Sequence, residues 1–358
     1  MPVNLALGHV SNDFMIAALV IYSLAVVAFA GDFAFGRPRR AESAARGQQD
    51  RERAAALAAV GAASATPGED GPQGAAAASA AGGSAAAPDA MPEPAVPALR
   101  AIGRAGPWVR AALALSAVAV AAHTVAVVTR GLAVHRAPWG NMYEFVTALT
   151  CIAAIFFLFV MVRYRAWTLG VFVMGAVVVA LGLAETLIYT PAGQLVPALQ
   201  SYWLDIHVTA MTLATGIFFV AAVLGLVYLA VDRYNRRVAA GRAQPGNGIV
   251  RRLPGLEQLD RLTYRTVVFG FPVWTFGVIA GAIWADQAWG RYWGWDPVET
   301  WAFITWVLYA AFLHARATAG WRGRRAHYIQ LLGFASLIFN ILVVQIFIAG
   351  LHSYAGVH

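Results

Sequence analysis

The 358-residue sequence contains no lysine and little charge of either sign. All of its basic residues other than histidine are arginine, and Asp, Glu, Lys and Arg together make up 12% of the chain. Soluble domains carry about 25% charged residues. Because 59% of the residues are hydrophobic, this shortage of charge argues against a soluble globular protein and indicates a membrane protein.

Cysteine is almost absent. The single cysteine, Cys151, lies inside an apolar run, which excludes an internal disulfide and a multi-cysteine zinc site. We expect it to be a small buried apolar residue. Without a C-x-x-C-H motif the chain is not itself a c-type cytochrome, and without a Walker A sequence ATP hydrolysis is not expected.

Eight apolar stretches come close to the roughly 20 residues that a spanning helix needs. They predict an all-α fold, a polytopic membrane bundle of about eight helices. The seventh stretch is short and begins at a proline, which suits a first helical turn, so we expect it to continue through His314 and Arg316. The stretches are Phe14–Phe35, Trp108–Thr129, Tyr143–Val162, Trp167–Leu187, Ile206–Val231, Thr266–Ala285, Pro297–Leu313 and Tyr328–Leu351.

The arginines predict the orientation. Only Arg130, Arg136 and Arg291 fall on one side of such a bundle, against 23 on the other. Because cytoplasmic segments collect arginine, both termini are expected outside, in a multi-pass protein of the bacterial plasma membrane. This sorting favours membrane lipid over nucleic acid as the partner of the basic segments.

The sequence divides into three parts. Residues 1–35 hold a first helix, which we interpret as retained rather than as a signal peptide because no basic segment precedes it. Residues 36–106, rich in Ala, Gly and Pro, predict a disordered cytoplasmic linker. Residues 107–358 form the membrane core, and a tryptophan-rich outer loop at 284–301 lies between the sixth and seventh of the eight predicted helices.

The tryptophan-rich loop at 284–301 holds the residues that suit the binding of a ligand. A lipid-interface belt explains Trp284 and Trp301, but it explains poorly a cluster of three tryptophans interleaved with glycines and closed by an aspartate. Glycines allow close approach and aromatic faces offer contact to a planar macrocycle. The cluster comprises Trp289, Trp293, Trp295 and Asp296. Asp296 and Glu299 also suit the simpler role of helix caps.

The motif W-G-x-x-W-x-W-D-x-x-E, from Trp289 to Glu299, resembles the tryptophan-rich "WWD" signature of heme-handling membrane proteins. Within that superfamily the chain is similar to the CcsA/ResC-type proteins of System II cytochrome c biogenesis, often labelled CcsB in actinobacteria. The resemblance covers about 108–358. It implies a heme b ligand, and it makes the four residues of the tryptophan cluster the expected catalytic platform.

Two histidines are the expected ligands of the heme iron. His207 and His352 fall at the outer ends of different helices, level with the tryptophan loop, and two neutral imidazoles can provide axial ligands. Taken alone, each is more often a polar anchor at the interface. The resemblance favours ligation, because the family places two external heme histidines beside its tryptophan domain.

A further histidine and two arginines complete the expected site. His314 lies 18 residues after Asp296, about 27 Å along a helix, and it resembles the family's transmembrane heme ligand. Arg136 and Arg291 suit heme propionates, although pairing with Glu144 or Asp296 competes. His123 and His135 have no assigned role, and His327 is interpreted as lipid-facing.

The resemblance implies a function. We expect a subunit of a holocytochrome c synthase that delivers heme to the outer face and attaches it to the thiols of an apocytochrome c C-x-x-C-H motif. A ResB-type membrane subunit and a thiol-reducing thioredoxin-like protein are the implied partners. Two alternatives stay open: a heme exporter without attachment activity, and a membrane diheme electron-transfer protein.

Overall fold

The computed structural model describes residues 3–35, 102–103, 105–193, 201–244, 249–318 and 321–352. Most of the predicted linker at 36–106 lies outside these residues. Within the described part of the chain the elements are helical and there is no strand. The helices are α1 (Leu5–Phe35), α4 (Pro107–Val134), α5 (Met142–Tyr164), α6 (Gly170–Leu187), α7 (Tyr202–Ala239), α8 (Leu256–Trp289), α9 (Pro297–Ala317), α10 (Arg324–Phe339) and α11 (Gln345–Phe347).

Eight membrane spans are present in the described ranges, each long and apolar enough to cross a bilayer. They confirm the all-α fold and overlap all eight predicted stretches. The seventh, α9, begins at Pro297 and continues past His314 to Ala317, as expected. The eighth combines α10 and α11 through a π-helical turn at Asn340–Val344.

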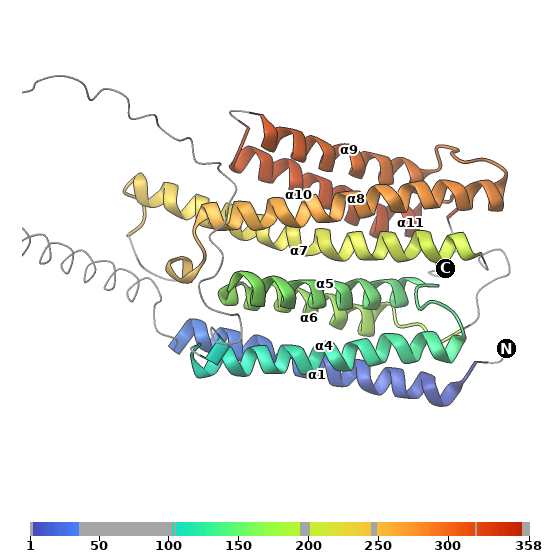
Figure 1. Ribbon diagram of the computed structural model, residues 1–358, viewed down its shortest axis with the longest axis horizontal. Helices are drawn as coiled ribbons and strands as arrows, with labels where there is room; N and C mark the ends of the chain where they lie inside the picture. Colours follow the sequence, from blue (N-terminus) through green and yellow to red (C-terminus); the bar gives the residue numbers. More distant parts are fainter. Residues whose placement is uncertain are drawn as a thin grey trace, which may run out of the picture.

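The helices run side by side in one bundle (Figure 1). At one side α1 packs along α4, while α5 contacts both α6 and α7; on the other side α7 packs along α8, and α9 along α10. One apolar core joins α1, α4, α5 and α6 with parts of α7 and α8, and a second joins α7, α8, α9 and α10 with Met142 of α5. Cys151 is buried in α5, which confirms its expected role as a small buried residue.

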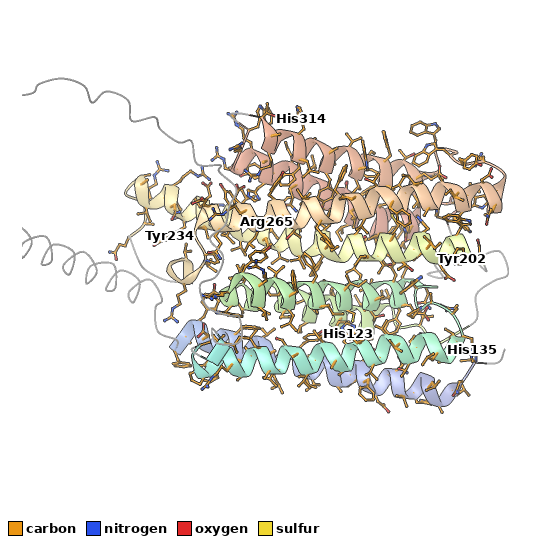
Figure 2. The ribbon with its side chains drawn as sticks, viewed as in Figure 1. His123, His135, Tyr202, Tyr234, Arg265 and His314 are labelled. Carbon is orange, nitrogen blue, oxygen red and sulfur yellow. The ribbon has the colours of Figure 1, made fainter. Side chains whose placement is uncertain are left out.

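The two ends of the bundle differ. Figure 2 shows Tyr202 and His135 at one end, which we call the cavity end, and Tyr234, Arg265 and His314 at the opposite end. Helix α7 has 38 residues, so at 1.5 Å per residue it is about 57 Å long. That exceeds the roughly 30 Å of a hydrocarbon core, and its arginine-rich last turns therefore extend beyond the bilayer at the opposite end.

Candidate heme site

The loop between α8 and α9 is fixed to the first turn of α9. Gly290 ends α8 with a φ of +71°, a conformation that glycine adopts without strain. The Glu299 carboxylate accepts hydrogen bonds from the backbone N–H groups of Gly294 (2.9 Å) and Asp296 (3.1 Å), and the Asp296 carboxylate accepts one from Val298 N–H. This reciprocal capping box satisfies the free donors of the helix start.

Asp296 does more than cap the helix. Its Oδ2 lies 2.8 Å from Nδ1 of His352, and its Oδ1 accepts a 2.6 Å hydrogen bond from Leu351 N–H. Burial alone would raise the pKa of the Asp296 carboxyl, but the hydrogen bonds from His352, Leu351 and Val298 outweigh it and lower the pKa. An ionised carboxylate accepts only, so Nδ1 of His352 carries a hydrogen, and in the neutral imidazole Nε2 then keeps its lone pair.

His207 is oriented in the same way by a different acceptor. Its Nδ1 lies 2.8 Å from the carbonyl oxygen of Gly277 in α8. A carbonyl oxygen accepts only, so Nδ1 of His207 carries a hydrogen, and the neutral imidazole keeps its lone pair on Nε2. The ring lies against α8 at Gly281, where an added Cβ would be 2.6 Å from ring atoms. Glycine at 281 therefore allows the ring its position.

The two histidines line one cavity at the cavity end. Trp284, Trp289 and Trp293 line it with them. The indole of Trp284 stacks on His207 with ring centroids 6.4 Å apart, and its edge meets His352 at 6.0 Å. Trp289 contacts His352 at 5.0 Å. The fold thus brings together residues that are 145 positions apart in the chain, as the sequence predicts.

Trp284 lies inside the bundle rather than at the lipid interface. Its side chain is only 3% exposed, and it contacts both histidines, so its assignment to a lipid belt was wrong. Trp295 lies elsewhere. Its side chain is 67% exposed, it does not line the cavity, and its backbone takes a φ of +56°. A bulky residue rarely adopts that conformation. The role predicted for Trp295 in the platform stays a prediction.

These residues fit the heme that the resemblance implies. Histidines that bind a metal through one ring nitrogen commonly donate the other N–H to a carbonyl or carboxylate, and His207 and His352 do so here. Tryptophan rings between and beside them offer an apolar wall to a flat macrocycle. His207 and His352 would bind the iron, Asp296 would position His352, and Trp284, Trp289 and Trp293 would contact the ring.

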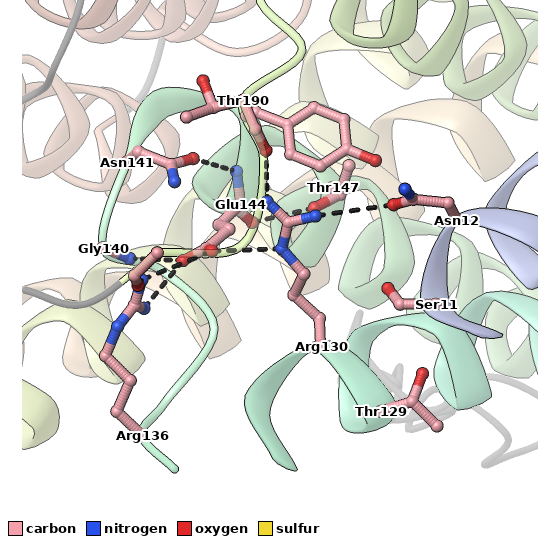
Figure 3. Close-up of polar contacts among 12 residues, drawn as sticks. Ser11, Asn12, Thr129, Arg130, Arg136, Gly140, Asn141, Glu144, Thr147 and Thr190 are labelled. Carbon is pink, nitrogen blue, oxygen red and sulfur yellow. Dashed lines mark hydrogen bonds and ion pairs between the residues drawn. The ribbon is translucent and has the colours of Figure 1, made fainter. Parts of the chain in front are cut away.

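Arg136 belongs to a buried ion-pair cluster (Figure 3). The fully buried Glu144 lies 2.7 Å from Arg136 and 3.1 Å from Arg130. Arg136 also donates to the carbonyl of Gly193, and Arg130 to that of Thr190. Pairing with Glu144, the competing explanation for Arg136, is therefore what the structure contains. The two arginines tie the segment after α6 to the ends of α4 and α5.

Arg291 stays available for an anion. Its side chain is exposed, its guanidinium lies beside Gly294, and it forms no ion pair within the described residues. His314 is exposed at the opposite end of the bundle (Figure 2). The structure thus leaves the propionate role of Arg291 and the heme role of His314 as predictions.

Two unassigned histidines differ in their surroundings. His123 is fully buried in α4, with its ring edge-to-face to Tyr22 at 5.9 Å. His135 follows α4 with a φ of +55° and an exposed side chain. Neither lines the cavity.

His327 does not face lipid, so its interpretation from the sequence was wrong. Its side chain is 0% exposed and stacks on Tyr228 with centroids 3.8 Å apart. Its Nε2 lies 3.1 Å from Asp260, which also pairs with Arg316 at 2.9 Å. A buried cluster from α7, α8, α9 and α10 thus joins these four helices near the opposite end.

A match to a known protein family covers the segment that contains the cavity. Residues 139–352 match the family described as "Cytochrome C assembly protein". The chain belongs to the cytochrome c assembly family. Of the cavity-lining residues only Ala137 lies outside the matched range, whereas α1 and α4 precede it. The role of the protein is therefore in cytochrome c biogenesis, and the segment that carries this role contains the cavity.

Curated relatives in this family share about a third of their residues with the chain. The cytochrome c biogenesis protein CcsA of Guillardia theta is 37% identical over 61% of this chain and 76% of its own length. CcsA of Gloeobacter violaceus is 34% identical over 67% and 84%, and CcsA of Gloeothece citriformis 34% over 73% and 89%. The protein is thus of the CcsA type.

One solved structure is also similar. The cytochrome c heme lyase CcmF matches 69% of this chain and 43% of its own length, with a TM-score of 0.49 and 22% identity. The chain therefore spans less than half of that protein.

Proposed function

We propose that the protein holds heme at the cavity end and attaches it covalently to the two thiols of an apocytochrome c C-x-x-C-H motif. One observation carries the proposal. Two histidines from distant parts of the chain line one tryptophan-walled cavity, and each has its Nδ1 hydrogen engaged by an acceptor. In the neutral imidazoles both Nε2 atoms are then left with the lone pair that an iron needs.

Thioether formation is an addition across a double bond. The C–S bond forms at one vinyl carbon, the thiol hydrogen ends on the other, and the C=C bond becomes single. The addition consumes no oxidant or reductant, so no redox group is needed for this step. Both thiols must reach the site reduced, however, which is why we propose a thioredoxin-like protein as a partner.

The contribution of the protein is orientation. Residues His207 and His352 fix the iron, and Trp284, Trp289 and Trp293 fix the plane of the ring beside it, so that the vinyl edge is held for the incoming thiols. Holding two reactants in a productive geometry can replace a large part of a bimolecular barrier. Heme here is a substrate that leaves with the product, and heme b, which carries both vinyl groups, is the form we propose.

The cavity end is proposed to face outward. Of the charged groups at that end, Arg130 and Arg136 are neutralised in part by Glu144, whereas the opposite end collects the arginines after α7 and before α8. Positive segments stay on the cytoplasmic side. Apocytochrome would then meet heme on the extracytoplasmic side of the plasma membrane, with a ResB-type subunit completing the complex.

An attachment assay tests the proposal. The protein is purified with and without a ResB-type partner, supplied with heme and a reduced apocytochrome c, and the product is scored by heme staining after denaturation. We expect a covalent product that requires both cysteines of the acceptor motif. Heme that binds and is released without ever becoming covalent, with the partner present, would favour an exporter instead.

A further inference from the structure

Three residues that line the cavity each hold a buried polar atom with no hydrogen-bond partner within the described part of the chain. These atoms are the indole nitrogens of Trp139 and Trp284 and the side-chain oxygen of Asn340. All three atoms are buried. A buried polar atom left unpaired costs about 1–3 kcal/mol, so such groups call for an explanation, and a ligand of the cavity is one.

The three atoms are of two kinds. The two indoles are donors only, and the Asn340 oxygen is an acceptor only. The orientation of the Asn340 amide follows from its surroundings. Its nitrogen donates to the carbonyl oxygen of Val298 at 3.2 Å, and the amide oxygen could not take that place because two acceptors would face each other. The oxygen is therefore the atom left without a partner.

Asn340 also begins the π-helical turn that separates α10 from α11. Such turns interrupt the regular backbone and occur often at functional sites. The turn lies on the wall that Asn340 shares with Ile341 and Gln345, while the segment that follows leads to His352. Asn340 thus lines the same cavity as the proposed iron ligand, on a different part of its wall.

Heme cannot satisfy all three atoms. The edge of the macrocycle carries methyl, vinyl and propionate groups, and ionised propionates accept hydrogen bonds only. The indole donors match these carboxylates, but the Asn340 acceptor has no donor to meet on heme. A peptide with a C-x-x-C-H motif does offer donors, namely backbone N–H groups, thiols and the imidazole N–H.

We propose that Trp139 recognises a heme propionate and that Asn340 recognises a donor of the apocytochrome segment, so that one cavity is built for both substrates together. The proposal rests on the proposed function and deepens it. Trp139 would take the part that the sequence suggests for Arg136, whose guanidinium is held by Glu144 and by the carbonyl oxygens of Ala137 and Gly193. Neither Trp139 nor Asn340 stands out in the sequence.

The proposed contact between Trp139 and a heme propionate is tested with two macrocycles. Heme and its dimethyl ester, which lacks the carboxylate charges, are titrated into the full-length protein. We expect Trp139→Phe to weaken heme binding about three- to tenfold, the range of one hydrogen bond, and to leave binding of the ester unchanged. Trp301→Phe, at a tryptophan of the same end that does not line the cavity, should change neither. Equal weakening for both macrocycles, or none for heme, would overturn this contact.

The proposed contact between Asn340 and the apocytochrome segment is tested with a fluorescent reduced peptide that contains C-x-x-C-H. With heme bound, Asn340→Leu should weaken peptide binding about three- to tenfold and leave heme binding unchanged. Peptide binding equal to wild type in Asn340→Leu, or a parallel loss of heme, would overturn it.

These binding measurements are independent of attachment. Wild-type protein that binds heme and peptide but forms no thioether contradicts the proposed function and leaves the recognition roles intact. Wild-type protein that binds heme but not the peptide overturns the role of Asn340 alone.

Discussion

Nδ1 of His352 lies 2.8 Å from Oδ2 of Asp296, and this contact links the tryptophan loop to the segment that follows α11. Asp296 is the N-cap of α9, and it does not line the cavity. It therefore acts through His352. Because the carboxylate accepts the Nδ1 hydrogen, it fixes the tautomer that leaves Nε2 free, and we expect it to be a positioning residue rather than one that touches heme.

Replacing Asp296 by Asn should weaken heme binding about tenfold or more, since outer partners of metal-binding histidines have effects of about 10- to 100-fold. The amide can also donate to Nδ1, which would favour the wrong tautomer. The measurement is a heme titration followed by the low-spin absorbance. If Asp296→Asn bound heme as tightly as wild type, the carboxylate would be a helix cap only.

The pH dependence of stability follows from the same residue. The folded-state pKa of Asp296 is lower than its ordinary value of 3.8, so its ionised form contributes stability that is fully present above that value. This contribution disappears as the pH falls through the lower folded-state pKa. The difference in melting temperature between wild type and Asp296→Asn should therefore shrink as the pH falls below about 4. A difference in melting temperature that grows as the pH falls below about 4 would contradict a lowered pKa of Asp296.

The tryptophans should separate into two groups. Trp284→Ala should lower heme content strongly, because it removes a buried ring that contacts both histidines, and a Trp→Ala change in a core costs about 3–5 kcal/mol. Trp295→Ala should retain heme, since this ring is exposed and outside the cavity. Heme content per protein at matched expression decides between them, and the reverse order would support the predicted platform role of Trp295.

The sequence predicted the fold better than the burial of single residues. Hydropathy located all eight spans, and the topology of those spans placed His207 and His352 at one end. Trp284 and His327 were misinterpreted for one physical reason. In a span that is apolar on every side, the pattern does not say which face meets the bundle and which meets lipid. Arg136 could not be assigned either, because its partner Glu144 competes with any propionate.

Glu144 should matter for stability rather than for chemistry. It lies fully buried between Arg130 and Arg136, and removing one partner of a buried ion pair costs about 3–5 kcal/mol because the other charge is left uncompensated. Glu144→Gln should therefore lower the melting temperature in detergent markedly, and should lower heme content only as far as folded protein is lost. As a surface-pair control, Glu257→Gln breaks the exposed pair with Arg261 and should cost less than about 1 kcal/mol. Equal losses of melting temperature in Glu144→Gln and Glu257→Gln would contradict the idea that burial makes the Glu144 ion pairs important for stability.

Gly281 offers a test of the position of His207 that leaves the imidazole in place. A methyl group at 281 would lie 2.6 Å from the ring, so Gly281→Ala should displace His207 and shift the heme spectrum toward high spin. Gly182→Ala in α6 is the matched control, because an added Cβ there meets nothing within 4 Å. A normal low-spin spectrum in Gly281→Ala would place the ring of His207 elsewhere when heme is bound.

The histidine pair itself gives the sharpest prediction. A heme iron with two neutral imidazoles is six-coordinate, and the protein tunes it through these ligands. Loss of one imidazole leaves an open position that a small molecule can fill. We expect His207→Gly and His352→Gly each to lose low-spin heme and cytochrome c maturation, and we expect added imidazole to restore both in part. The measurement is the absorbance spectrum of the purified variants, and the yield of attached heme, with and without imidazole.

Rescue separates ligation from a structural role. A histidine that only anchors its helix acts through its attachment to the backbone, and free imidazole cannot replace that. Asp296→Asn provides the internal comparison: its histidines are intact, so added imidazole should restore little. Full low-spin signal and full maturation in both glycine variants without imidazole would remove His207 and His352 from the mechanism. Rescue of His352→Gly but not of His207→Gly would leave a single protein ligand to the iron, with His207 held against Gly277 for structural reasons.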